Sequence, residues 1–261
     1  MEQSLLDIRN AEISYDGVPV VHDLTLSMKK GEILGIVGES GSGKSTLIRG
    51  AMGLLGKNGA VTKGDIFYKG KNVLDAKPEE VRKMRGPEMG MVFQNTGASL
   101  CPVRKIEDQL FESVLQHEKT EKEEIRRRAM ELFEKMHLDQ GERILKSYPF
   151  ELSGGMNQRV GLMMAMILKL DLLFADEPTS ALDVTVQASV VREMMKMREL
   201  YGTGIAIVTH NIGVVEFMAD KVAVMHQGRL VEYGTKEEVI RHPQEPYTKK
   251  LIGAVLRIQR G

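Results

Sequence analysis

The sequence predicts an α/β fold with a mainly parallel core sheet, and three observations support this prediction. Short, almost continuously apolar segments such as Ile33–Val37 and Leu170–Ala175 have the pattern of parallel strands that are buried on both faces. Helical segments alternate with the strands, as Val184–Leu200 does after the second one. A glycine-rich segment joins Ile33–Val37 to a helix that begins at Lys44. Such a strand, loop and helix predict a ligand site at one end of the sheet.

The N-terminal part is expected to be rich in strands. Its turn-forming residues and alternating apolar residues predict the following elements: strands Leu5–Tyr15 and Val20–Met28 around the turn Asp16–Pro19, strand Ile33–Val37, a helix from Lys44 to about Leu55, and strands Gly64–Tyr68 and Met89–Phe93. Residues 95–166 are more charged and have helical periodicity, which predicts a helical insertion.

The C-terminal part returns to alternating strands and helices. The expected elements are strand Leu170–Ala175, helix Val184–Leu200, strand Gly204–Thr209, helix Ile212–Ala219, strands Lys221–Met225 and Arg229–Tyr233 around the turn Gln227-Gly228, and two short helical segments. In the last segment an apolar helix face, formed by Tyr247, Leu251, Ile252, Val255 and Leu256, is expected to pack on the chain's own domain.

Length and composition exclude several classes of protein. The chain has 261 residues, enough for one large domain with an insertion, and equal numbers of basic and acidic residues, 36 of each, so no overall positive charge attracts nucleic acid. The single cysteine, Cys101, excludes an intrachain disulfide and a multi-cysteine metal site, and it fits a reducing compartment. The N-terminus has no apolar signal core, and the longest apolar run, Val160–Leu168, is too short to span a membrane. We therefore expect a soluble, cytoplasmic protein whose membrane role, if any, depends on partners.

The glycine-rich segment Gly38-Glu39-Ser40-Gly41-Ser42-Gly43-Lys44-Ser45-Thr46 matches the phosphate loop of P-loop NTPases. Its glycines allow the backbone N–H groups from Gly41 to Thr46 to point at phosphate oxygens, next to the positive end of a helix dipole. Lys44 is expected to reach the β- and γ-phosphates of ATP, and the Ser45 hydroxyl to ligate Mg²⁺. The alternative, a chance glycine-rich turn, is disfavoured by the strand before it and the helix after it.

Two adjacent carboxylates, Asp176 and Glu177, follow an apolar strand. Asp176 is expected to hold Mg²⁺, and Glu177 to orient or deprotonate the attacking water. Taken alone, the pair could instead cap the next helix, but the phosphate loop favours the catalytic interpretation.

The segment Leu152-Ser153-Gly154-Gly155-Met156 between these two motifs resembles the signature sequence of ATP-binding-cassette (ABC) ATPases. The resemblance implies the ABC ATPase fold, in which an antiparallel β subdomain and a helical subdomain flank the core. It implies residues 1–94 and 167–233 as core with β subdomain, 95–166 as helical subdomain and 234–261 as a short helical end. It also implies that Ser153, Gly154 and Gly155 contact ATP held by a second subunit.

Four further positions match the ABC pattern and take their expected roles from it. Gln94 matches the glutamine that contacts Mg²⁺ and water and relays movement to the helical subdomain. Asp183, in the segment Ser180–Asp183, matches a residue at the dimer interface, and His210 matches the switch histidine at the γ-phosphate. Tyr15 matches the aromatic residue that stacks on adenine. Each also has an ordinary structural interpretation: a surface amide for Gln94, a helix cap for His210 and a strand aromatic for Tyr15.

Several runs are similar to the importer ATPases for peptides and nickel. They are Met91–Pro102, Ser180–Ala188, Thr209–Val215, His242–Thr248 and Tyr148–Glu151. Met156 replaces the commoner glutamine of the signature, Cys101 stands where asparagine is expected, and Asn211 stands where aspartate usually follows the histidine. The end at Gly261 weakly favours the shorter, nickel-type members over the longer peptide-type ones.

The resemblance implies an importer ATPase at the cytoplasmic face of the membrane. Its partners are expected to be a second, non-identical ABC ATPase subunit, two integral membrane permeases and an extracytoplasmic solute-binding protein. The alternative is an ABC ATPase of a soluble complex, as in phosphonate breakdown. A DNA-associated ABC ATPase is disfavoured because the chain has neither a coiled-coil insertion nor tandem cassettes.

Two features have simpler interpretations than binding sites. In Glu121–Arg128, Glu123 and Glu124 lie four residues before Arg127 and Arg128, which predicts helix ion pairs rather than a basic docking patch. The methionines of Met156–Met166 and Met194–Met197 are expected to pack in the core rather than bind a metal.

Overall fold

The computed structural model describes residues 4–94, 96–180 and 182–258, with side chains described up to residue 254. The residues pack into two compact units, one formed by 1–82 and 204–261, the other by 83–203. Among the described residues, no helix is both long and apolar enough to cross a membrane. The predicted division of the chain into core with β subdomain, helical subdomain and short helical end, with boundaries at residues 94, 166 and 233, remains a prediction.

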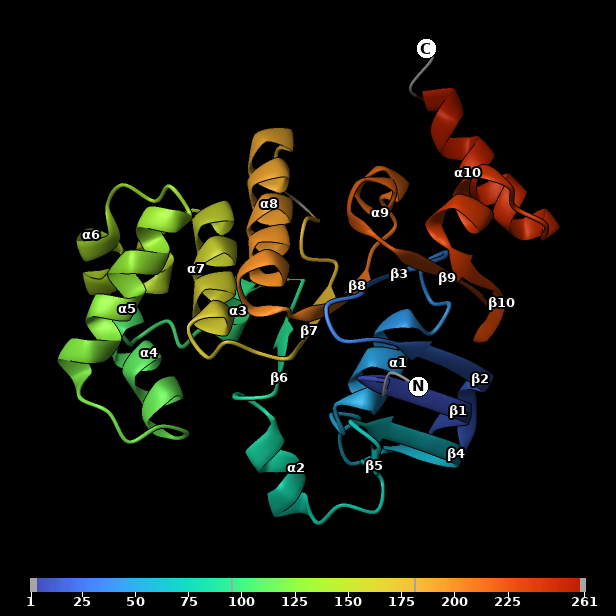
Figure 1. The fold of residues 1–261 in the computed structure, drawn as a ribbon, viewed down its shortest axis with the longest axis horizontal. Helices are drawn as coiled ribbons and strands as arrows, with labels where there is room; N and C mark the ends of the chain where they lie inside the picture. The colour runs from blue at the N-terminus through green and yellow to red at the C-terminus, as the bar shows by residue number, and fades with distance from the viewer. Residues whose placement is uncertain (1–3, 95, 181, 259–261) are drawn as a thin grey trace. The chain divides into compact units, whose positions relative to one another are not determined.

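The first unit contains a four-stranded antiparallel sheet in the order β2-β1-β4-β5 (Figure 1). Its strands are β1 (Leu6–Tyr15), β2 (Val18–Met28), β4 (Gly59–Tyr68) and β5 (Lys71–Asn72). The β1–β2 connection is a two-residue turn, because Asp16 and Gly17 both have positive φ, 50° and 78°, and Tyr15 pairs with Val18. Two positive φ values give the turn the twist that an antiparallel hairpin requires. This sheet confirms the predicted antiparallel β subdomain.

The strand before the phosphate loop lies inside a second group of strands in this unit. The order is β10-β9-β3-β8, and β3 runs parallel to both of its neighbours. The strands are β3 (Ile33–Val37), β8 (Gly204–Val208), β9 (Lys221–His226) and β10 (Arg229–Thr235). Every residue of β3 is buried, as its apolar sequence predicts. The loop that follows β3 is therefore anchored to a rigid, buried strand.

Helices complete the first unit. They are α1 (Lys44–Ala51), most of α2 (Pro78–Met84), α9 (Ile212–Met218), the helical turn η2 (Glu237–Arg241) and α10 (Pro246–Ile258). Gly35 of β3 faces α9 so closely that an added Cβ would lie 2.6 Å from Val215 Cγ1. A larger residue at position 35 would therefore separate α9 from the strand that carries the loop.

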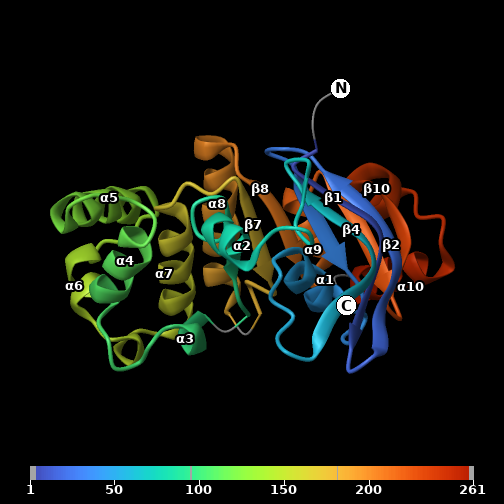
Figure 2. The same cartoon turned by 90° about the horizontal axis from the view of Figure 1, so that it is seen from below.

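The second unit combines a parallel strand pair with a helical cluster. The strands β6 (Met89–Val92) and β7 (Leu172–Asp176) pair in parallel. Helices α4, α5 and α6 pack against one another, and α5 also packs against α7 (Figure 2). The helical elements are α3 (Thr96–Ser99), α4 (Ile106–Leu115), α5 (Lys122–Lys135), α6 (Gly141–Lys146), η1 (Pro149–Glu151), α7 (Gly154–Met166) and α8 (Val184–Tyr201).

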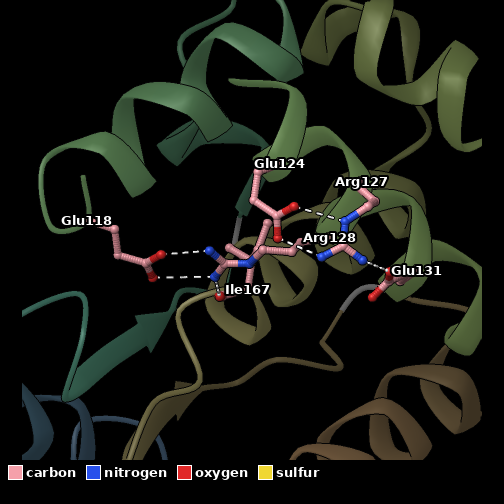
Figure 3. A network of polar contacts seen from close by, with 6 residues as sticks. All are labelled: Glu118, Glu124, Arg127, Arg128, Glu131 and Ile167. Atoms are coloured by element: carbon pink, nitrogen blue, oxygen red, sulfur yellow. Dashed lines mark hydrogen bonds and ion pairs between the residues drawn. The ribbon is translucent and has the colours of Figure 1, made fainter. Parts of the chain in front are cut away.

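Ion pairs on α5 tie this helical cluster together (Figure 3). Arg128 binds Glu118 in the preceding loop at 2.6 Å and also donates to the backbone oxygen of Ile167 at the end of α7. Arg127 runs along the helix surface and pairs with Glu124 and Glu131. Exposed pairs such as those of Arg127 contribute little stability. Arg128 is less exposed and joins the loop before α5 to the end of α7.

Most of the predicted elements are confirmed, and the exceptions have local causes. The helix after the phosphate loop ends at Ala51 rather than near Leu55, because Gly53 takes a left-handed conformation (φ 63°). Strand β4 begins at Gly59 rather than Gly64, since its largely exposed first half also pairs with β1. The short elements β5 and α2 were not predicted.

The expected pairing within Glu121–Arg128 was right in kind but wrong in detail. Arg127 pairs with Glu124 three residues before it, and Arg128 pairs outside the helix with Glu118. The methionine prediction holds for the buried Met163, Met166, Met194 and Met197. On the last helix Ile252 is buried and Tyr247 partly so, while the side chains of Val255 and Leu256 lie outside the described residues.

Candidate phosphate-binding site and catalytic residues

The phosphate loop is shaped by glycines that other residues could not replace. Gly38, Gly41 and Gly43 have φ values of 150°, 78° and 93°. An added Cβ on Gly38 would lie 2.1 Å from the backbone oxygen of Met225, so β9 packs directly against the loop at this residue. An added Cβ on Gly41 would meet nothing within 4 Å, so that side of the loop is open. The loop is thus supported on one side and accessible on the other, as a ligand cradle requires.

Lys44 lies at the centre of this loop. It is buried, and its ammonium donates hydrogen bonds to the backbone oxygens of Gly38 at 2.9 Å and Glu39 at 2.7 Å and to Ser42 Oγ at 3.3 Å. The loop therefore concentrates a positive charge among oxygens that are weaker acceptors than a phosphate oxygen. The arrangement fits a nucleotide phosphate group.

The start of α1 adds backbone donors to the same place. The helix begins at Lys44, and its N-cap, Gly43, has no side chain that could bond to the N–H groups of the first turn, which also contains no acidic residue. These N–H groups belong to Lys44, Ser45 and Thr46, and the helix dipole adds positive potential around them. The donor set fits an anion, and Mg²⁺ ligation by Ser45 remains a prediction.

Tyr15 and His210 belong to the same unit as the loop. Tyr15 ends β1, is half-buried, and lies beside Gly59, where an added Cβ would be 2.7 Å from Tyr15 Cε1. His210 is exposed between β8 and α9. The alternative interpretation of His210 as a helix cap is wrong, because the N-cap of α9 is Asn211, whose side chain accepts from the N–H groups of Gly213 at 3.0 Å and Val214 at 3.4 Å. Asn211 therefore performs the capping function, so the asparagine does not weaken the helix. The nucleotide contacts of Tyr15 and His210 remain predictions.

Asp176 and Glu177 stand at the end of β7 in the second unit. Asp176 is buried, and Glu177 takes a left-handed conformation with φ 48°, which is rare for a residue with a side chain. The turn is held by Ser180, whose N–H and hydroxyl donate to the backbone oxygen of Glu177 at 3.1 and 3.0 Å. Seven other non-glycine residues in the described part of the chain share a positive φ, which is common in tight turns. The catalytic role of Glu177 remains a prediction.

Ser153, Gly154 and Gly155 form the start of helix α7. Ser153 is the N-cap, and its Oγ accepts from the N–H of Met156 at 3.2 Å. An added Cβ on Gly154 would meet nothing within 4 Å, whereas on Gly155 it would lie 2.8 Å from Val186 Cγ1 of α8. The segment thus presents a glycine surface and a helix N-terminus, which suits contact with a phosphate group.

The remaining predicted residues also lie in the second unit. Asp183 is the N-cap of α8 and accepts from the N–H of Val186 at 3.0 Å. Gln94 is exposed after β6. Ala181 of the predicted interface segment lies outside the described residues. Mg²⁺ ligation by Gln94 and Asp176 and the interface role of Asp183 remain predictions.

Sequence reasoning missed a buried ion pair behind the signature segment. Arg159 of α7 donates to Glu193 of α8 at 2.6 Å and also to the backbone oxygen of Met136. Only 3% of the Glu193 side chain is exposed, and burial raises its pKa to about 7 although Arg159 favours the charged form. The available signal was the position of Glu193, which is spaced on α8 with the buried apolar residues Val190, Met194 and Met197.

Comparison with known proteins gives a consistent result. The family model described as "ABC transporter" matches residues 21–180. The dipeptide transport ATP-binding protein DppD of Lactococcus lactis subsp. cremoris is 40% identical over 97% of this chain and 74% of its own length. The oligopeptide transport ATP-binding protein OppD of Haemophilus influenzae is 39% identical over 97% of this chain and 80% of its own length.

Solved structures of two ABC proteins are similar to this chain in fold. CbiO1 of Clostridium perfringens, part of the ABC transporter complex cbiONQ, has a TM-score of 0.80 and 26% identity, covering 99% of this chain and 97% of its own. The ATP-binding cassette MJ0796, solved as a dimer bound to ADP and Pi, has a TM-score of 0.77 and 26% identity, covering 88% of this chain and 98% of its own.

Proposed function

The chain belongs to the ABC transporter family and is an ATPase, and we propose that it powers the import of peptides. The observation that carries this proposal is the complete phosphate loop, with Lys44 buried at its centre, in a chain that shares 40% identity with a dipeptide transport protein. The nickel-type substrate remains a prediction. The names of the relatives favour import over the alternative of a soluble complex.

In the proposed site, each chain binds ATP with its own loop. The N–H groups of Gly41–Thr46 and the ammonium of Lys44 bind the phosphates, and Tyr15 stacks on the adenine. Ser45, Gln94 and Asp176 hold Mg²⁺, which supplies charge neutralisation at the phosphates. The open side of the loop at Gly41 and the lack of a side-chain cap hydrogen bond at the start of α1 support the assignment of the phosphates to this loop.

Hydrolysis is proposed to require a second ABC subunit. Ser153, Gly154 and Gly155 of one chain contact the ATP held by the other, and Asp183 lies at the interface between them. The accessible glycine surface at Gly154 supports this role, and the related MJ0796 cassette was solved as a dimer. Closure excludes water from the site and brings the helix N-terminus to the phosphates, which places charge stabilisation where negative charge develops. Glu177 orients or deprotonates the attacking water, and His210 contacts the γ-phosphate.

The proposed assembly places this chain at the cytoplasmic face of the membrane. Its partners are a non-identical ATPase subunit, two permeases and a solute-binding protein. Gln94 and the helical cluster transmit closure of the ATPase pair to the permeases.

The test is to purify the assembled complex from membranes, identify its subunits and measure ATP hydrolysis with added di- and oligopeptides. We expect peptides to stimulate hydrolysis in the complex with the binding protein, and Glu177→Gln to lower turnover by about 10²-fold or more while ATP still binds. Recovery of soluble partners alone would contradict the import proposal. Near-normal hydrolysis by Glu177→Gln would show that this carboxylate is not the base.

A further inference from the structure

A residue near the C-terminus contacts the phosphate loop directly. The hydroxyl oxygen of Tyr247, at the start of α10, accepts a hydrogen bond from the backbone N–H of Glu39 at 3.1 Å, across 208 residues of sequence. The backbone oxygen of the same Glu39 accepts from the ammonium of Lys44 at 2.7 Å. One loop residue therefore connects the C-terminal helix to the lysine that is expected to bind phosphate.

Tyr247 is held firmly in its place. Its ring stacks on that of His226 at the end of β9, with centroids 3.9 Å apart and planes inclined by 29°. Its neighbour Thr248 is fully buried. Just before α10, the carboxylate of Glu232 on β10 accepts the N–H groups of Gln244 at 2.7 Å and Glu245 at 3.3 Å. These contacts fix the start of α10 on the β9–β10 hairpin.

The same hairpin touches the loop at two more points. The N–H of Gly228, in its turn, donates to the backbone oxygen of Ser42 at 3.2 Å. At Gly38 the loop packs against the backbone oxygen of Met225. The hairpin and Tyr247 together therefore contact the beginning and the middle of the loop.

From these contacts we infer that Tyr247 is a positioning residue for the phosphate loop. It holds the Glu39 peptide in the orientation that points the later N–H groups of the loop at a phosphate. The inference rests on the proposed function, because its consequence is tighter nucleotide binding. A loop that is already ordered loses less conformational freedom on binding, so part of the affinity comes from pre-organisation.

The chemistry of the hydroxyl suits this role. A phenol is neutral at physiological pH, and desolvation raises the pKa of Tyr247 further, so the side chain brings no charge to a loop that must accept an anion. A neutral hydroxyl accepts the Glu39 N–H without adding negative charge near the phosphates.

The test compares two tyrosine-to-phenylalanine variants of the full chain. Tyr247→Phe removes the contact with Glu39 but keeps the ring that stacks on His226. Tyr233→Phe is the matched control, because the Tyr233 hydroxyl also forms a hydrogen bond with a distant backbone group of the same unit, here as donor to the oxygen of Ser27. The first measurement is the Kd for ATP by calorimetry. The second is hydrogen exchange of the Glu39 amide in nucleotide-free protein labelled with ¹⁵N-glutamate.

We expect Tyr247→Phe to weaken ATP binding by about 3- to 10-fold, in line with the loss of one hydrogen bond, and to speed exchange of the Glu39 amide. Tyr233→Phe is expected to stay within about two-fold of the unchanged chain in both measurements, since its hydrogen bond lies outside the loop. Tyr247→Ala, which also loses the ring stack, is expected to bind more weakly than Tyr247→Phe.

Unchanged ATP affinity and unchanged exchange in Tyr247→Phe would overturn the inference while leaving the proposed function intact. Equal weakening by Tyr233→Phe would also overturn it, because the effect would then be one of general stability. If the unchanged chain binds no ATP, the proposed function fails and the inference fails with it.

Discussion

Replacing Glu193 by glutamine is expected to change the pH dependence of stability with a definite sign. The carboxyl of Glu193 is almost fully buried beside Arg159, and desolvation raises its pKa from 4.5 to about 7. Arg159 and Lys196 favour the charged form, but their effect is smaller than that of burial. In the folded chain the carboxyl therefore holds its proton up to near-neutral pH, whereas in the unfolded chain it loses the proton near its ordinary value.

The magnitude follows from the difference between the two pKa values. Between pH 4.5 and 7 the folded state binds more protons than the unfolded state, so this group's contribution to the free energy of unfolding falls as the pH rises. A shift of roughly 2.5 pKa units corresponds to about 3 kcal/mol, fully lost above pH 7. Below pH 4.5 the carboxyl is protonated in both states, so this contribution is fully present and no longer changes with pH.

The assay is urea unfolding of the unchanged chain and of Glu193→Gln at pH 5 and pH 8. At pH 5 the protonated carboxyl and the amide are nearly equivalent, because both are neutral and both offer an oxygen to Arg159. At pH 8 we expect Glu193→Gln to gain about 3 kcal/mol relative to the unchanged chain, since only the latter must bury a charged carboxylate. Glu199→Gln, an exposed position on the same helix, is the control and is expected to change by less than about 0.5 kcal/mol at either pH.

The opposite result would refute the reasoning. If the ion pair with Arg159 dominated over desolvation, the carboxylate would stabilise the folded chain, and Glu193→Gln would lose stability between pH 5 and pH 8 relative to the unchanged chain. A difference that does not depend on pH would show that the carboxyl does not titrate in this range.

Three further predictions concern the site itself. Gly38→Ala places a Cβ 2.1 Å from the backbone oxygen of Met225, so the loop must shift. We expect the free energy of unfolding, measured with urea, to fall by about 1–3 kcal/mol and ATP binding, measured by calorimetry, to weaken. Normal ATP affinity would contradict the proposed shape of the loop. Lys44→Met removes the buried ammonium, and we expect ATP to bind at least about tenfold more weakly, with ADP affected less than ATP if Lys44 reaches the γ-phosphate. Ser153→Arg is expected to abolish hydrolysis by the assembled pair while the single chain still binds ATP, and loss of ATP binding by the isolated chain would argue against action across an interface.

The sequence alone predicted the parts of this protein that depend on local conformation. Glycines at fixed spacing specify the phosphate loop, because its backbone angles suit few other residues. The turn Gln227-Gly228 was predicted with the right residues, whereas the predicted turn Asp16–Pro19 is shorter in the structure, where β2 begins at Val18. The buried strand β3 follows from its continuous apolar run. The ABC family could be identified from the same motifs because their order along the chain is itself informative.

Only the tertiary structure decided which distant residues meet. The hydrogen bond from Glu39 to Tyr247 and the ion pair between Arg159 and Glu193 join residues 208 and 34 positions apart, and no local pattern encodes either contact. Burial of Glu193, which raises its pKa, depends on how α7 and α8 pack rather than on its neighbours in sequence. The short elements β5 and α2 were missed for the same reason, since β5 exists only through its pairing with β4 and α2 is too short to show a helical period. Motifs thus determined the chemistry of this chain, whereas packing decided which side chains support it.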